Sequence, residues 1–253
     1  DKVDDLQEWL SKSLCTSIEF PASSISEQPW IFLNPATEAF LQKMKTNSAK
    51  QLSDIAYLYV GLQTSADPIY ILKPTKETLQ DITVEKNNKE WIIEKSVLRP
   101  CIYDLTFLPF SSPECNAYII FPYTIDENGA NLIPSSIMKE KYPKCWEYLL
   151  SNKTRLQKRD IQKGNSGNWY QFGRSQSLTK FNGKHKIIWP VLSLDSNYVY
   201  DDKDVLFTGG GNGPYYALRM KDGQQLSLFY LLGILSHPMI EMLVKSKAST
   251  FRG

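Results

Sequence analysis

Histidine is scarce in this sequence, and the motifs of several enzyme classes are missing. His185 and His237 are the only histidines among 253 residues, and neither has a second ligand at metal-site spacing. No G-K-[ST] phosphate loop occurs, and the glycine-rich run 209–213 leads into Pro214 and does not complete G-x-G-x-x-G. A G-x-S-x-G nucleophile elbow is missing too. The sequence therefore indicates no catalytic residue and no metal ligand, and it predicts a turn at 209–213.

Long apolar runs and paired cysteines are also absent. No run approaches the roughly 18 apolar residues that span a bilayer, and no signal-peptide pattern opens the chain. The four cysteines (Cys15, Cys101, Cys115 and Cys145) are scattered without a C-x-x-C pair. We therefore expect a reduced, cytoplasmic protein without membrane contact. The hydrophobic content of 42% and the charged content of 22% are those of an ordinary globular protein.

Positive charge is concentrated in one block of the chain. The formal net charge is +2, yet residues 1–138 hold 11 Lys/Arg against 18 Asp/Glu, while residues 139–186 hold 12 against 3. A basic block of this size inside an otherwise acidic chain favours a polyanionic partner at one face. A solvated helix face is the alternative that such a charge run leaves open.

Hydrophobic periodicity and turn residues predict an α+β fold with an irregular, mostly antiparallel sheet, a long basic helix and C-terminal helices. Residues 52–72 read as strand, polar turn and strand, and Asn128-Gly129 is a turn signal. Further strands are expected at 82–85, 91–95, 101–107, 117–123 and 186–192, and helices at 3–14, from 35 to 44, and at 141–160, 226–235 and 239–247. We expect a connector at 1–29 and one domain at 30–253, with possible sub-lobes 30–135 and 136–253.

The stretch from Asn165 to Gln176, N-S-G-N-W-Y-Q-F-G-R-S-Q, has the composition of a loop that contacts nucleic acid. Arg174 suits guanine, and Gln171 or Gln176 suits adenine, by matched hydrogen-bond geometry. Trp169 and Tyr170 are either core anchors or a platform beside the DNA. In a second polar turn, Thr64 and Ser65 can donate to phosphates or base edges, although a plain hairpin turn fits equally. Phosphate contacts are expected from Lys153, Lys158, Arg159, Lys163 and Lys180.

Several short motifs follow one another in an order that resembles a known family. Leu52-Ser-Asp-Ile-Ala and Gly61-Leu-Gln-Thr-Ser-Ala-Asp67 are similar to a signature L-x-D-I-A … G-I-x-T-G-x-D. Leu98-Arg-Pro100, Tyr118 to Tyr123, Trp169-Tyr170, Gly173 to Gln176 and Lys186-Ile-Ile then follow at plausible spacing. Residues 30–253 thereby resemble the TaqI-like C-terminal specificity domain of adenine-N6 DNA methyltransferases and fused type II restriction enzymes. Ser65 stands where the family usually has glycine.

The resemblance implies a DNA target-recognition module of a bacterial or archaeal phage-defence enzyme. Its partners would be double-stranded DNA and a covalently linked methyltransferase domain upstream. S-adenosylmethionine would be the cofactor of that parent protein, and these 253 residues would hold neither the cofactor nor a catalytic site.

The sequence leaves two alternative functions open. A protein-interaction or scaffold module would dock through the helices at 226–247, and it would tolerate loss of Arg174. A self-contained enzyme would pair a cysteine with His185, although no local motif supports such a pair.

Overall fold

The computed structural model describes residues 35–48, 50–108, 111–159, 168–181, 183, 185–193, 195, 197–209 and 214–247. Two compact units are present, one of residues 1–49 with 242–253 and one of residues 50–241. In the first unit, α2 (Pro35–Asn47) begins with proline at its first position and carries Glu38 in its first turn and Lys45 in its last. Both charges stabilise the helix dipole. The helix predicted from 35 to 44 is therefore confirmed.

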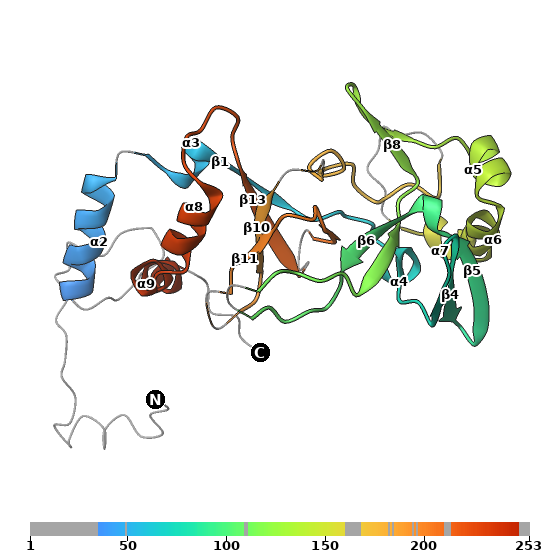
Figure 1. Cartoon of the computed structure of the whole chain (residues 1–253), viewed down its shortest axis with the longest axis horizontal. Coiled ribbons are helices and arrows are strands. Elements are labelled where there is room, and N and C mark those ends of the chain that lie inside the picture. The colour runs from blue at the N-terminus through green and yellow to red at the C-terminus, as the bar shows by residue number, and fades with distance from the viewer. Residues whose placement is uncertain are drawn as a thin grey trace, which may run out of the picture. The chain divides into compact units, whose positions relative to one another are not determined.

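A four-stranded antiparallel sheet forms one layer of the unit 50–241. Its strand order is β1 (Ala56–Val60), β13 (Tyr215–Met220), β10 (Lys186–Pro190) and β11 (Val199–Asp201). The helix α8 (Leu228–Leu235) lies beside this sheet (Figure 1) and buries Leu231, Leu232 and Leu235 against it. At its start, the Ser227 hydroxyl accepts a hydrogen bond from the Phe229 amide at 3.2 Å, which caps the helix.

A second sheet joins segments that are far apart in the sequence. Its order is β12 (Leu206–Phe207), β6 (Leu98–Ile102), β7 (Ala117–Ile120) and β2 (Ile71–Leu72), and the β12–β6 pair is parallel. The 3-10 turn η2 (Lys95–Val97) leads into β6. Strand pairing in both sheets crosses the expected sub-lobe boundary at residue 135, since β1 pairs with β13 and β6 with β12.

The remaining strands form a three-stranded sheet and a two-stranded hairpin. β3 (Lys76–Glu77), β4 (Asp81–Lys86) and β5 (Lys89–Glu94) form a three-stranded sheet, and β8 (Tyr123–Asp126) pairs with β9 (Gly129–Leu132). Asn87 and Asn88 connect β4 to β5 with φ of 54° and 57°, the left-handed conformation that a two-residue hairpin requires. The turn predicted at Asn128-Gly129 is confirmed, with φ of 128° at the glycine.

The long helix predicted at 141–160 is wrong. Three short helices occupy the region, namely α5 (Ser135–Lys141), α6 (Pro143–Ser151) and α7 (Lys153–Gln157). Tyr142 has φ of −132° and ψ of 55°, outside the helical region, and Pro143 has no amide to continue the helix. The Glu94 carboxylate accepts hydrogen bonds from the Lys144 and Cys145 amides, each at 2.8 Å. A carboxylate from β5 therefore caps α6 at its amino end.

The strand, polar turn and strand predicted at 52–72 are confirmed in part, because both strands are present but do not pair with each other. Residues 52–55 form the short helix α3 (Leu52–Ile55), and β1 and β2 belong to different sheets. Between them lies α4 (Asp67–Tyr70), with Pro68 in its first turn. The remaining predicted strands are present with shifted ends, and the two C-terminal helices are confirmed as α8 and α9 (Pro238–Lys247). Helices mixed with mainly antiparallel strands confirm the α+β fold class.

Two buried clusters hold the unit 50–241 together. The larger joins the second sheet, α6 and the aromatic residues of the 168–181 segment, and the smaller lies between α8 and the first sheet. The three cysteines in the described part of the chain, Cys101, Cys115 and Cys145, form no disulfide. No single described helix has the length and apolar composition to cross a membrane. The helical segments 228–235 and 238–245 meet both criteria only when they are counted together, and they are bent relative to each other.

Candidate nucleic-acid interface

The segment from Gly61 to Asp67 runs alongside the end of β12. Leu62 forms a bridge with Thr208, its amide donates to the Phe207 carbonyl at 2.9 Å, and its carbonyl accepts from the Gly209 amide at 3.0 Å. The two backbones are so close that a Cβ on Gly209 would lie 2.2 Å from the Gly61 nitrogen. Both positions therefore require glycine.

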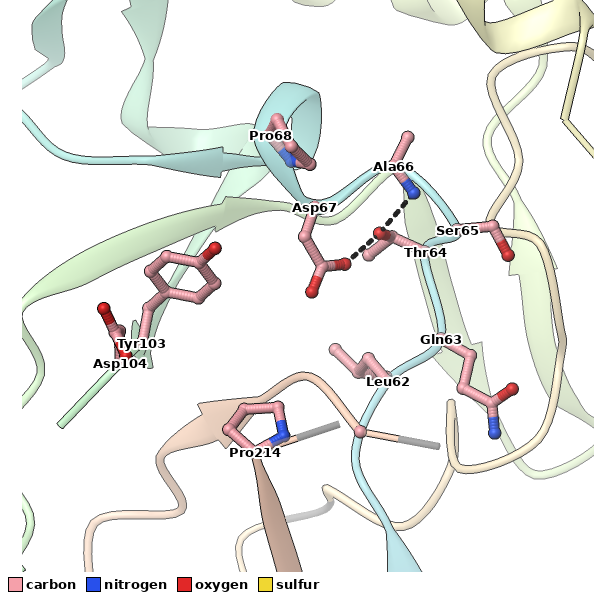
Figure 2. A pocket seen from close by; sticks show the side chains of 11 residues that line it. Leu62, Gln63, Thr64, Ser65, Ala66, Asp67, Pro68, Tyr103, Asp104 and Pro214 are labelled. Carbon is pink, nitrogen blue, oxygen red and sulfur yellow. Dashed lines mark hydrogen bonds between the residues drawn. The ribbon is translucent and has the colours of Figure 1, made fainter. Parts of the chain in front are cut away.

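The turn that follows is held by its own side chains. The Thr64 hydroxyl donates to the Asp67 carboxylate and accepts from the Ala66 amide at 3.0 Å (Figure 2). Thr64 is fully buried, so its hydroxyl serves the turn. Ser65 is exposed at the tip and has φ of 54°. Serine thus adopts here the left-handed conformation that a glycine takes most easily.

A second loop packs along this turn through main-chain bonds. The Gly173 amide donates to the Thr64 carbonyl and the Arg174 amide to the Gln63 carbonyl, both at 3.1 Å. The two polar segments that the sequence selected, 63–65 and 168–176, are therefore in direct contact. They lie about 110 residues apart in the sequence, which places their contact among the long-range pairings that set the fold.

Arg159 ties the two loops together. Its guanidinium Nη1 donates to the Thr64 carbonyl, and Nη2 donates to the carbonyls of Trp169 and Gln171, each at 2.9 Å. The Nε donates to the Leu156 carbonyl at 3.0 Å. All three guanidinium nitrogens are thus used on the protein's own backbone. In this arrangement Arg159 positions the loops, and the phosphate contact expected of it stays a prediction.

Aromatic side chains that pack in the core hold the second loop, residues 168–176, in place. Tyr170 is buried and donates from its hydroxyl to the Ile133 carbonyl at 2.7 Å, while the Tyr70 hydroxyl donates to the Tyr170 carbonyl at 2.8 Å. Trp169 packs against Trp146 with ring centroids 5.4 Å apart. Of the two roles considered, core anchoring is confirmed for Tyr170; Trp169 is partly buried and packs against the core. Tyr123 accepts from the Phe172 amide at 2.6 Å and fixes the loop centre.

A cavity of about 610 Å³ opens on the other side of the turn. Figure 2 shows the Asp67 carboxylate between Tyr103, Leu62 and Pro214, with the Gln63 and Ser65 side chains directed away from it. Burial raises the pKa of Tyr103, and the carboxylates of Asp67 and Asp104 raise it further. Two acidic residues make this cavity unsuited to phosphate.

Curated proteins to which the chain is similar include two type II restriction–modification enzymes. The chain is 27% identical over 266 residues to "Type II restriction enzyme and methyltransferase RM.Eco57I" of Escherichia coli, a match that covers 100% of this chain and 26% of that protein. It is 22% identical over 208 residues to "Type II methyltransferase M.BanIII" of Aneurinibacillus aneurinilyticus, covering 82% of this chain and 33% of that protein. No protein-family model matches the chain. Its homologues are type II restriction–modification methyltransferases, and it spans between a quarter and a third of the length of these two.

The structure brings four of the ten predicted contact residues together. Thr64, Arg159, Gln171 and Arg174 meet at the paired loops, and Ser65 lies beside them at the turn tip. The Gln171 side chain is buried, with 5% of the residue exposed, so it is not placed to reach a base.

The other predicted residues lie around the paired loops or elsewhere. Lys153 and Lys158 are exposed at the two ends of α7, and the Lys153 ammonium lies 5.6 Å from the centre of the Trp169 ring. Gln176 is exposed at the end of the second loop. Lys180 lies against Tyr57, and Lys163 falls outside the described residues.

Three residues near Lys180 were missed by the sequence-based predictions. Tyr57 of β1 stands opposite Arg219 of β13 in the sheet register, and Lys221 follows directly after that strand. Their signal is weak in the sequence, because a tyrosine and two cations 162 to 164 positions away show no local motif. No cluster of His, Cys, Asp or Glu suited to a metal ion occurs in the described part of the chain.

Proposed function

We propose that this chain is the DNA-recognition part of a type II restriction–modification methyltransferase. In this proposal it grips double-stranded DNA at a specific sequence while a covalently linked methyltransferase domain upstream modifies an adenine. S-adenosylmethionine is then the cofactor of that other domain, and the whole protein works in the cytoplasm of a bacterium or archaeon. The similarity to two type II enzymes over 100% and 82% of the chain supports this class of parent protein.

One observation carries the recognition role. The turn at 63–65 and the loop at 168–176 are joined by two main-chain hydrogen bonds and by one arginine that bonds to both. Polar side chains on rigid, internally braced loops are the arrangement that base recognition requires, since each donor must keep a fixed position. Unbraced loops would lose binding free energy to the cost of ordering them.

Within this interface the exposed polar side chains divide into two expected roles. Ser65 and Gln176 are exposed, and Arg174 is half-buried with its Nη1 on the Gly173 carbonyl at 3.1 Å. We assign base-edge contacts to Arg174 and Gln176, and a phosphate or base-edge contact to Ser65. Lys153 and Lys158 fit phosphate contacts, which add salt-dependent affinity without reading sequence.

A salt series on duplex DNA tests the proposal. We expect the full-length protein to bind duplex DNA with an affinity that falls steeply as salt rises. Arg174→Ala should reduce discrimination between preferred and unrelated duplexes by about 1 to 3 kcal/mol, whereas Lys158→Gln should weaken binding to both about equally. Salt-independent binding, or no binding, would contradict the proposal.

A second candidate function is supported by the surface of α8. Phe229 and Tyr230 are 62% and 60% exposed, which is unusual for two adjacent large aromatic residues and fits a protein-docking face. This function predicts that Phe229→Ser abolishes a stable partner complex and that Arg174→Ala leaves all binding unchanged. The DNA measurement above separates the two functions.

A further inference from the structure

Three cations surround one exposed aromatic ring at the edge of the first sheet. The ring belongs to Tyr57 on β1, which is 43% exposed. The Arg219 guanidinium lies 5.1 Å from its centroid, the Lys221 ammonium 5.3 Å and the Lys180 ammonium 5.7 Å. Because each cation lies within 5.7 Å of the ring centroid, any two of them are at most about 11 Å apart. This separation is near the 8–10 Å screening length of physiological salt, so the cations repel each other.

Within the described part of the chain, this positive charge is not neutralised by ion pairs. No described carboxylate forms an ion pair with Lys180, Arg219 or Lys221. The Nε and Nη1 atoms of Arg219 are buried without a described hydrogen-bond partner, which leaves a partly desolvated cation uncompensated. Cation–π contact with the Tyr57 ring offsets a part of that cost.

A buried lysine of the same sheet shows the contrast. Lys186 on β10 is fully buried, and its ammonium pairs with Asp201 at 2.5 Å and with Asp204 at 2.9 Å. The buried cation of the sheet is therefore paired twice, whereas Arg219, Lys221 and Lys180 have no ion pair with a described carboxylate. An external anion at these three cations would remove their mutual repulsion.

The site is close to the recognition loops along the chain. Lys180 follows Arg174 by six residues, so their Cα atoms are at most about 22 Å apart, a length of about six base pairs of duplex. Tyr57 precedes Thr64 by seven residues in the strand that leads into the turn (Figure 1). Both recognition segments are thus within a few residues of this site along the chain.

We propose that Tyr57, Lys180, Arg219 and Lys221 form a binding site for backbone phosphates of duplex DNA, beside the loops that read the bases. This inference rests on the proposed function. The three cations supply the charge, and the Tyr57 hydroxyl can donate to a phosphate oxygen. Because the Tyr57 ring packs against all three cations, it also holds them close together when no DNA is bound.

The test compares lysine variants of the full-length protein across a salt series on duplex DNA. Lys180→Gln and Lys221→Gln should each weaken binding by about 3- to 10-fold near 0.1 M salt and reduce the salt slope by about 1, and together by about 2. Lys89→Gln is the matched control, since its ammonium lies 3.8 Å from the Trp91 ring on the distant β4–β5 hairpin. It should leave both the affinity and the slope unchanged.

Two contrary results have different meanings. If the unaltered protein binds DNA and both lysine variants keep its salt slope, the cluster only protects a sheet edge and the inference is wrong. If the unaltered protein does not bind duplex DNA, the proposed function fails and this site fails with it. Thermal unfolding of each variant, with Tyr57→Phe as the variant that keeps the ring and loses the hydroxyl, separates loss of binding from loss of fold.

Discussion

The guanidinium of Arg159 donates a hydrogen bond to the backbone carbonyl of Thr64, a residue 95 positions earlier in the chain. The same side chain also bonds to the Trp169 and Gln171 carbonyls. One arginine therefore fixes the relative position of the two loops to which we assign DNA recognition.

Arg159→Lys should destabilise the protein by about 2 to 3 kcal/mol, because a lysine ammonium cannot reproduce the bonds of a planar guanidinium to separate carbonyls. Urea unfolding measures this loss. Arg155→Lys, on the exposed face of α7, should change stability by less than about 0.5 kcal/mol. If Arg159 served DNA phosphates, the lysine variant would keep its stability, because both residues carry one charge.

Ser65→Gly should leave the turn intact and raise stability by up to about 1 kcal/mol. Serine at φ of 54° incurs a left-handed backbone cost of about 1 to 2 kcal/mol that glycine avoids, and the greater freedom of glycine in the unfolded chain cancels part of that gain. Ser53→Gly inside α3 is the control and should lower stability by about 0.5 to 1 kcal/mol. Equal losses at both positions in thermal unfolding would contradict this account of the turn.

Gly209→Ala should be strongly destabilising, by about 3 kcal/mol or more, because the new methyl group would lie 2.2 Å from the Gly61 nitrogen. Gly233→Ala in α8 provides the contrast, since nothing lies within 4 Å of its added Cβ. It should stabilise the helix by up to about 1 kcal/mol. The melting temperature of each variant is compared with that of the unaltered protein. Shifts in the same direction for both variants would contradict the close approach of the backbones at Gly61 and Gly209.

Stability should fall as pH rises from about 10 to about 12. Burial raises the pKa of Tyr123 from 10.0 to about 12, so the folded state keeps a proton that the unfolded state loses. The resulting stabilisation, about 2 to 3 kcal/mol, is present below pH 10 and disappears as pH passes the folded pKa. Urea unfolding across this range checks it. Tyr123→Phe should show a smaller alkaline loss, whereas the exposed Tyr230→Phe should match the unaltered protein.

Local patterns allowed much of the fold to be predicted, and long-range contacts account for the errors. The alternation in residues 81–94 and the apolar helices near the C-terminus were sufficient to predict β4, β5, α8 and α9. The pairing of β1 with β13 was not predictable, because Tyr57 and Arg219 share no local signal. Pro143 did signal a helix boundary, but the amphipathic pattern on either side of it concealed the break.

The candidate site was partly predictable for a similar reason. Composition and motif order selected both polar segments, and the structure places them in contact. The side chains within them were assigned less well. Thr64 and Gln171 are buried, and Arg159 bonds to backbone carbonyls, which carry no sequence signal at all.

The most direct test of the central claim is selection of duplexes from a random-sequence library by the full-length protein, followed by sequencing of the bound fraction. We predict that one short motif is enriched, that Arg174→Ala relaxes the preference at one position of it, and that Lys89→Gln leaves it unchanged. Enrichment of no sequence, or an identical motif after Arg174→Ala and Gln176→Ala together, would contradict the claim that these loops read DNA.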